Sequence, residues 1–101
     1  MKNDVISEIF GFLKGKGIVA TESEFSMDWL GCSESYVRKL RSARTEPSIG
    51  AIAICASRLQ KAGDDMIALQ RYRQLGTEFI AMSEKCRALV NVDAVEFDLA
   101  A

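Results

Sequence analysis

The chain has 101 residues, 49% of them hydrophobic, and can hold one small domain. It contains no histidine, so the commonest general base and the commonest metal ligand are both missing. No glycine-rich phosphate loop, Cys-x-x-Cys pair or Gly-x-Ser-x-Gly turn is present either. We therefore expect a protein that is not an enzyme and that needs no cofactor or metal.

The pattern of apolar residues indicates a mostly helical chain. A single proline and little strand-like alternation before the last dozen residues are typical of an all-α protein. No signal peptide or membrane-spanning run stands out, so we expect a cytoplasmic protein that does not interact with membranes. The three cysteines, Cys32, Cys55 and Cys86, lie in apolar helical patterns and are interpreted as buried thiols.

The first of five expected helices lies near the start of the chain. Apolar residues recur at helical spacing over about 4–14, and Gly15 and Gly17 follow as stop signals. Residues 18–24 are expected to form a loop.

Two helices are expected in the second half. Ser48 should open the fourth helix, and Gly63 lies just past its end, as a left-handed cap would. Asp64 and Asp65 then open a fifth helix that extends to roughly Leu89, because acidic residues are favourable at the positive end of a helix.

Between these parts the sequence predicts two short helices joined by a tight turn. Such a unit needs a compact residue where the helices touch, a residue that tolerates positive φ in the turn, and an aliphatic residue on the second helix. Met27, Gly31 and Val37 stand at these places. Ser33 can cap the second helix, which should run over about 34–42.

This stretch resembles the lambda-repressor and Cro-like (XRE-type) helix-turn-helix proteins, and it also looks like a group of small bacterial helix-turn-helix proteins. The resemblance covers roughly residues 24–61. It implies a five-helix fold and a DNA-binding protein whose second short helix enters the major groove. The residues that carry it are the turn glycine, the cap serine, two aliphatic residues three apart and a Pro-Ser pair: Gly31, Ser33, Val37, Leu40 and Pro47-Ser48.

Cations are concentrated in the same region, although the net charge of the chain is -1. Residues 33–61 carry an excess of four positive charges, and DNA affinity depends on where the cations lie. The alternative is an ordinary solvated helix face. The cations of this block are Arg38, Lys39, Arg41, Arg44, Arg58 and Lys61.

The outward side of the helix expected over about 34–42 predicts which residues contact DNA bases and which contact phosphates. Glu34, Ser35 and Lys39 should approach base edges, while Arg41 and Arg44 should hold phosphates. The ring of Tyr36 should pack on the preceding helix, with its hydroxyl reaching a phosphate. The full set of expected DNA-binding residues is Ser33, Glu34, Ser35, Tyr36, Arg38, Lys39, Arg41 and Arg44.

The expected fifth helix carries an apolar stripe with alternating spacings of three and four, typical of paired helices. It predicts a homodimer, with residues 1–63 binding DNA and residues 64–101 forming a dimerisation helix and an acidic tail. The same stripe could instead pack on the other four helices. The expected interface residues are Tyr72, Leu75, Phe79, Met82, Cys86 and Leu89.

After Leu89, apolar residues nearly alternate with acidic ones over residues 90–101. Two interpretations fit this pattern. It is either an edge strand exchanged across a dimer or a disordered tail that folds on meeting a protein partner.

The leading hypothesis is a small, homodimeric, sequence-specific regulator of transcription that binds double-stranded DNA. The alternative is a protein-protein interaction module that keeps the helix-turn-helix fold and has lost DNA binding. A sequence pI of about 5.4 favours this alternative.

Overall fold

In the computed structural model the chain folds into an all-α domain, as its composition predicts. The structure describes the backbone of residues 2–100 and the side chains of residues 2–92. Five α-helices and one 3-10 turn lie in this part: α1 (Lys2–Gly15), α2 (Glu22–Asp28), α3 (Tyr36–Ala43), α4 (Ile49–Ile67), the turn Gln70–Tyr72 and α5 (Arg73–Ala100).

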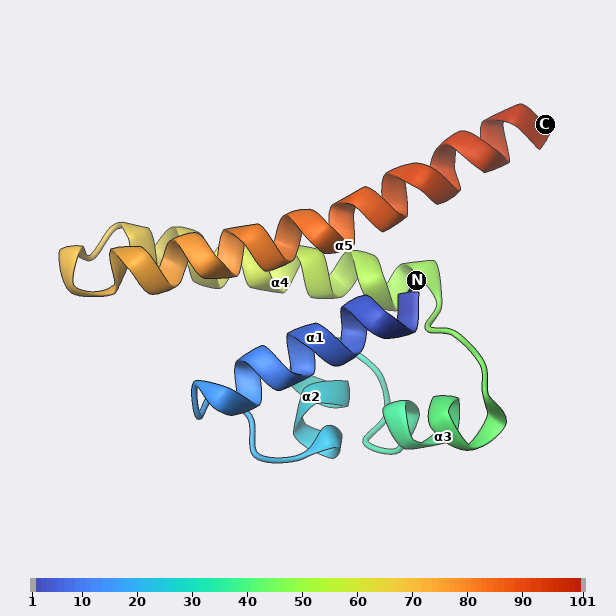
Figure 1. Cartoon of the computed structure of the whole chain (residues 1–101), viewed down its shortest axis with the longest axis horizontal. Helices are drawn as coiled ribbons and strands as arrows, with labels where there is room; N and C mark the ends of the chain where they lie inside the picture. Colours follow the sequence, from blue (N-terminus) through green and yellow to red (C-terminus); the bar gives the residue numbers. More distant parts are fainter. Residues whose placement is uncertain (1, 101) are drawn as a thin grey trace.

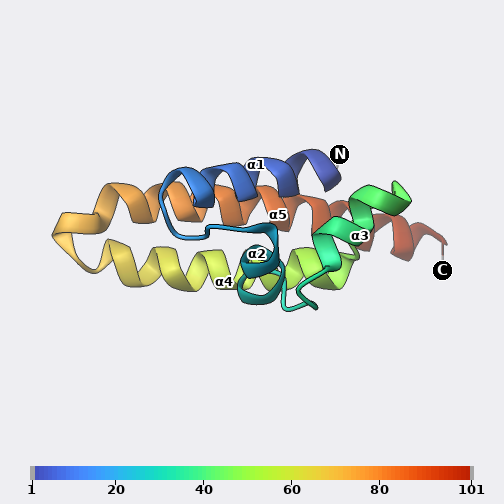
Figure 2. The same ribbon diagram turned by 90° about the horizontal axis from the view of Figure 1, so that it is seen from below.

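The long helices α4 and α5 run antiparallel, side by side, and form the largest part of the molecule (Figure 1). The first helix lies against α5, and α2 packs against α3. Arg58 of α4 contacts the end of α2, which lies over α4 when the molecule is seen from below (Figure 2). The 3-10 turn that joins α4 to α5 is at one end, and α3 is near the other (Figure 1). This arrangement leaves α3 at the edge of the domain.

The core lies where α1, α2, α4 and α5 meet. Aromatic rings bridge the helices: Phe12 of α1 contacts Phe79 of α5, with ring centroids 5.3 Å apart, and Phe10 contacts Phe25 of α2 at 5.4 Å. Pairs at these separations contribute beyond their buried area. Fully buried aliphatic residues complete the core, among them Ile9, Leu13, Leu30, Ile52 and Leu59.

The first helix ends as expected. Gly17 has φ +75°, and the backbone N–H of Ile18 donates to the carbonyl of Leu13 at 2.9 Å. The second helix begins earlier than expected, within the predicted loop. Thr21 accepts a hydrogen bond from the N–H of Glu24 at 3.1 Å, and the Glu24 carboxylate accepts one from Ala20 at 2.9 Å. The Thr-x-x-Glu pattern is the sequence signal for this start.

The expected end of the fourth helix at Gly63 is wrong. Gly63 lies inside α4, buried, directly against α5. A Cβ added to Gly63 would lie 2.9 Å from the carbonyl oxygen of Gly76, and one added to Gly76 would lie 2.7 Å from that of Gly63. The two glycines therefore let the α4 and α5 backbones touch. Asp64 and Asp65 consequently sit in α4, and the fifth helix begins at Arg73.

The apolar stripe of α5 faces the core of its own chain, and its expected role as a dimer interface stays a prediction. Phe79, Cys86 and Leu89 are buried, and Leu75 and Met82 pack against the same cluster. Tyr72, which is 43% exposed, lies in the 3-10 turn ahead of α5. The face of α4 offers the matching apolar partner within the same chain, which is the alternative considered for this stripe.

The last segment also differs from expectation. Residues 90–100 continue α5, in place of an exchanged strand or a disordered tail. The expected boundary between residues 1–63 and 64–101 falls within α4. The side chains that were expected to hold a protein partner, from residue 93 onward, lie outside the described residues.

Candidate nucleic-acid interface

The predicted helix-turn-helix unit corresponds to α2, α3 and the turn between them. Gly31 has φ +66°, in the left-handed region that favours glycine. A Cβ at this position would also lie 3.2 Å from a methyl carbon of Ile54 in α4. The expected role of Gly31 is confirmed.

The compact residue at the contact between the two helices is Ser26, whereas Met27 was expected. Ser26 is fully buried, and Met27 is 45% exposed. The hydroxyl of Ser26 donates to the carbonyl of Glu22 at 2.8 Å and accepts the backbone N–H of Val37 at 3.2 Å. Because this N–H lies in the first turn of α3, a side chain of α2 satisfies a donor that α3 cannot satisfy itself.

The third helix begins two residues later than expected. Ser35 occupies its N-cap position without a side-chain hydrogen bond, and Ser33 contributes only its carbonyl, which accepts from Tyr36 N–H at 3.1 Å. The expected cap at Ser33 is therefore wrong. Ser33 and Glu34 are exposed in the turn before α3.

Tyr36 is half-buried, and its hydroxyl accepts the backbone N–H of Ser48 at 2.9 Å. Ser48 is the N-cap of α4, as expected, and accepts from Ala51 N–H at 3.2 Å. The Tyr36 hydroxyl thus joins α3 to the start of α4. The expected contact of this hydroxyl with a phosphate stays a prediction.

The helix α3 ends at a C-cap residue, Arg44, whose backbone is in the left-handed conformation. Arg44 has φ +54°, and the N–H of Thr45 donates to the Leu40 carbonyl at 3.0 Å. The turn directs the chain away from α3 toward the buried Pro47. The Arg44 side chain remains exposed at the end of the helix.

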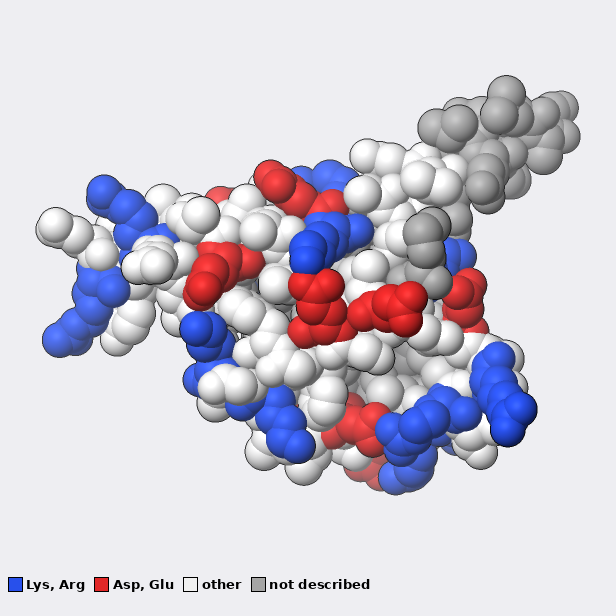
Figure 3. Space-filling view, viewed as in Figure 1, with Lys and Arg blue, Asp and Glu red and all other residues white. Residues whose placement is uncertain are grey.

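The structure separates the cations of this region into two groups. Arg38, Lys39 and Arg44 are exposed, and within residues 2–92 no ion pair or hydrogen bond engages their side chains. Figure 3 shows cations gathered over α3, beside a smaller group of acidic residues.

Arg41 and Arg58 make internal contacts. Arg41 forms an ion pair with Glu22 of α2, and this hydrogen bond raises the pKa of the Arg41 guanidinium. Arg58 donates to the carbonyls of Met27 at 3.0 Å and Asp28 at 2.8 Å, so it caps the last turn of α2.

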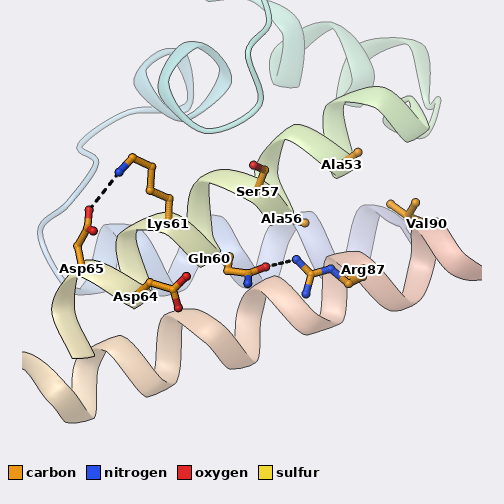
Figure 4. Close-up of a pocket in the computed structure, with 9 residues that line it drawn as sticks. All are labelled: Ala53, Ala56, Ser57, Gln60, Lys61, Asp64, Asp65, Arg87 and Val90. Atoms are coloured by element: carbon orange, nitrogen blue, oxygen red, sulfur yellow. Dashed lines mark hydrogen bonds and ion pairs between the residues drawn. The ribbon is translucent and has the colours of Figure 1, made fainter. Parts of the chain in front are cut away.

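A surface hollow of about 460 Å³ lies between α4 and α5, on residues separate from those of α3. Small side chains of α4, such as Ala53 and Ser57, border it (Figure 4). Arg87 of α5 donates to the Gln60 side chain, and Lys61 pairs with Asp65 at 3.5 Å. This hollow has no local signal in the sequence, because its residues come from two helices whose pairing the apolar spacing does not specify.

The three thiols are free. Cys55 and Cys86 are fully buried between α4 and α5, where the neighbouring Cys86 thiol and burial raise the pKa of Cys55. Cys32 is half-buried, and burial raises its pKa, against an opposing effect of Arg58. The interpretation as buried thiols is confirmed for Cys55 and Cys86.

Within the described residues, no group of three or more Cys, Asp or Glu side chains could hold a metal ion. None of the helices there is long and apolar enough to cross a membrane.

A comparison with known protein families then identifies the chain. The model of a family described as a family of unknown function (DUF6626) matches residues 6–98. The chain belongs to this family. No curated protein and no solved structure matches it. The DUF6626 description states no activity.

Proposed function

We propose that this protein is a sequence-specific regulator that binds double-stranded DNA, with α3 in the major groove. The observation that carries the proposal is the exposed face of α3. Arg38 and Lys39 project there, while Val37 and Tyr36 are fastened on the other side by Ser26 and Ser48. A helix that is fixed at its back and cationic at its front has the form of a recognition helix.

The contacts divide by position. Lys39 and Arg38 are in the middle of the exposed face, where side chains reach base edges. Arg44 extends from the end of the helix, where a phosphate would lie. Arg41 can contribute to phosphate binding only in competition with Glu22, its partner in the fold.

The proposal is tested by titrating the full-length protein with duplex DNA at several salt concentrations. Affinity should fall steeply with salt, because each phosphate contact releases counterions. On a panel of duplexes, Lys39→Ala should reduce discrimination at particular base pairs by about 1–3 kcal/mol, and Arg44→Ala should weaken all duplexes alike. Fluorescence anisotropy measures both effects.

Arg71→Ala is the matched control. Arg71 is exposed in the 3-10 turn at the end of the molecule away from α3, so its loss changes the net charge equally and should leave affinity nearly unchanged (Figure 1). Absence of binding at low salt, or equal loss in all three variants, would reject α3 as the reading helix.

The second candidate is a protein-protein interaction module that does not bind DNA. The internal use of Arg41 and Arg58 favours it, because two cations of the basic block, one of which was expected to hold a phosphate, are engaged within the domain. The hollow between α4 and α5 offers such a module a surface. The same duplex titration distinguishes the two candidates, since this one requires no affinity even at low salt.

A further inference from the structure

A groove of about 300 Å³ runs under α3, between this helix and α1. Its apolar part comes from Ile6 of α1 with Val37 and Leu40 of α3. Its charged rim comes from Glu22, Arg41 and Arg44. The volume is at the lower end of the range of pockets that hold small organic molecules.

The groove exists because α3 packs incompletely against α1, although Arg41 is paired with Glu22 of α2. No residue within 36–43 is fully buried, and Val37 and Leu40 are half-buried. The Ser26–Val37 and Tyr36–Ser48 hydrogen bonds hold the start of α3.

Beyond the other end of α3, the Asn3 amide donates to the Thr45 carbonyl at 3.3 Å. Between these points the apolar side of α3 is left incompletely covered. Covering it with an apolar molecule would be favourable, because apolar surface would be removed from water.

The charges on the rim determine which molecule fits. Glu22 and Arg41 neutralise each other through their ion pair. The Arg44 side chain, exposed and without an ion pair among residues 2–92, leaves one positive charge in excess. A guanidinium binds a carboxylate through charge-assisted hydrogen bonds. The complementary ligand is therefore a monoanion with an apolar tail.

We propose that this groove binds an alkyl carboxylate of medium chain length. The carboxylate lies on Arg44, and the chain covers Ile6, Val37 and Leu40. The ligand would thus contact the side of α3 opposite to Arg38 and Lys39, and reach Arg44 at the end of the helix. The inference does not depend on DNA binding, since the groove and its charges are present in the domain itself.

Sodium octanoate is a suitable probe, with methyl NMR of the full-length protein as the readout. Octanoate should cause saturable shifts at the methyl groups of Ile6, Val37 and Leu40, while those of the core residue Ile52 stay in place. 1-Octanol, which has the same chain without the charge, should bind more weakly. An octanoate titration without saturable shifts at these methyl groups, or equal binding of octanol, overturns the proposal.

Two variants locate the site. Arg44→Gln should lower octanoate affinity roughly tenfold or more, the effect expected from losing a charge-assisted hydrogen bond. Arg38→Gln, an equal charge change on the exposed face of the same helix, should leave it unchanged. Ser7→Phe, at an exposed position on the groove wall, should block binding without removing a charge. Unchanged Ile52 shifts verify folding, and wild-type affinity in Arg44→Gln or Ser7→Phe contradicts the site.

Discussion

Two hydroxyl groups hold the start of α3. One belongs to a residue of the neighbouring α2, and the other reaches from α3 to the start of α4. Ser26 of α2 accepts the N–H of Val37, and Tyr36 accepts the N–H of Ser48. Both N–H groups lie where a helix leaves its own donors unsatisfied. The orientation of α3 therefore depends on these hydrogen bonds together with the packing of Tyr36 and Val37 against the core.

Replacement of Ser26 by alanine should destabilise the domain by about 1–3 kcal/mol, because the half-buried Val37 N–H would lose its acceptor. Chemical denaturation measures this loss. Hydrogen exchange at the Val37 amide should become faster than at amides within α4. Ser23→Ala, on the same helix, is the control and should have little effect. A Val37 amide that exchanges as slowly in Ser26→Ala as in the wild type would contradict this role.

For single residues, the sequence predicts a required backbone conformation better than it predicts a side-chain contact between helices. Gly31 and Ser48 were identified because a positive φ and a helix cap demand particular residue types. Ser26 was missed in favour of Met27, since adjacent residues on a short helix differ only in which side they face. The direction of the Arg41 side chain toward Glu22 depends on tertiary structure and has no local signal.

Among the elements, α4 and α5 owe their pairing to small residues at the crossing. Glycine in a helix is unfavourable by about 1 kcal/mol relative to alanine, which is why Gly63 was interpreted as a helix end. Here Gly63 and Gly76 face each other across the helix pair, and their backbones come into contact. The close approach brings Ile67 and Ile80 against the opposite helix, and this packing offsets the cost.

Gly76→Ala should destabilise the domain although alanine is the better helix former. Its Cβ would lie 2.7 Å from the Gly63 carbonyl oxygen and 2.9 Å from the Ile67 backbone nitrogen, neither of which can move independently. Overpacking of this kind costs about 1–3 kcal/mol. Thermal and urea denaturation should show a lower stability than that of the wild type.

Gly11→Ala is the matched control, because Gly11 lies within α1 and an added Cβ meets nothing within 4 Å. This variant should gain up to about 1 kcal/mol from helix propensity. A stabilised Gly76→Ala variant would mean that the helices separate at little cost.

The number and type of elements could be predicted from apolar spacing, but their ends and partners could not. The stripe from Leu75 to Leu89 correctly identified the buried face of a helix. Spacing alone does not distinguish a partner in the same chain from one in a second copy. The alternation after residue 89 was interpreted as strand or tail, whereas the backbone continues as α5.

For the whole molecule, the burial of the α5 stripe leaves the question of where a second copy could bind. The hollow between α4 and α5 combines small residues with balanced charge. Lys61 and Arg87 supply its positive charges, and Asp64 and Asp65 supply its negative charges. Lys61 and Asp65 pair with each other, and Arg87 contacts the uncharged Gln60 (Figure 4).

We infer that an isologous contact at this hollow pairs Arg87 of each chain with Asp64 of the partner subunit. In such an isologous contact each pair of complementary groups occurs twice. We therefore predict a homodimer through the α4–α5 hollow, in place of the dimer through the α5 stripe. The two α3 helices would then lie outside the contact, because neither contributes a residue to the hollow.

Sedimentation of the wild-type protein over a micromolar concentration series should show self-association. Arg87→Glu and Asp64→Arg should each weaken it, because the variant chains place like charges opposite each other. The double variant Asp64→Arg with Arg87→Glu should associate again, since it exchanges the two charges and restores the pairing. Arg71→Glu, in the exposed turn, controls for net charge and should associate as the wild type does. A monomeric wild type, or a double variant weaker than either single one, would show that this hollow is not the dimer surface.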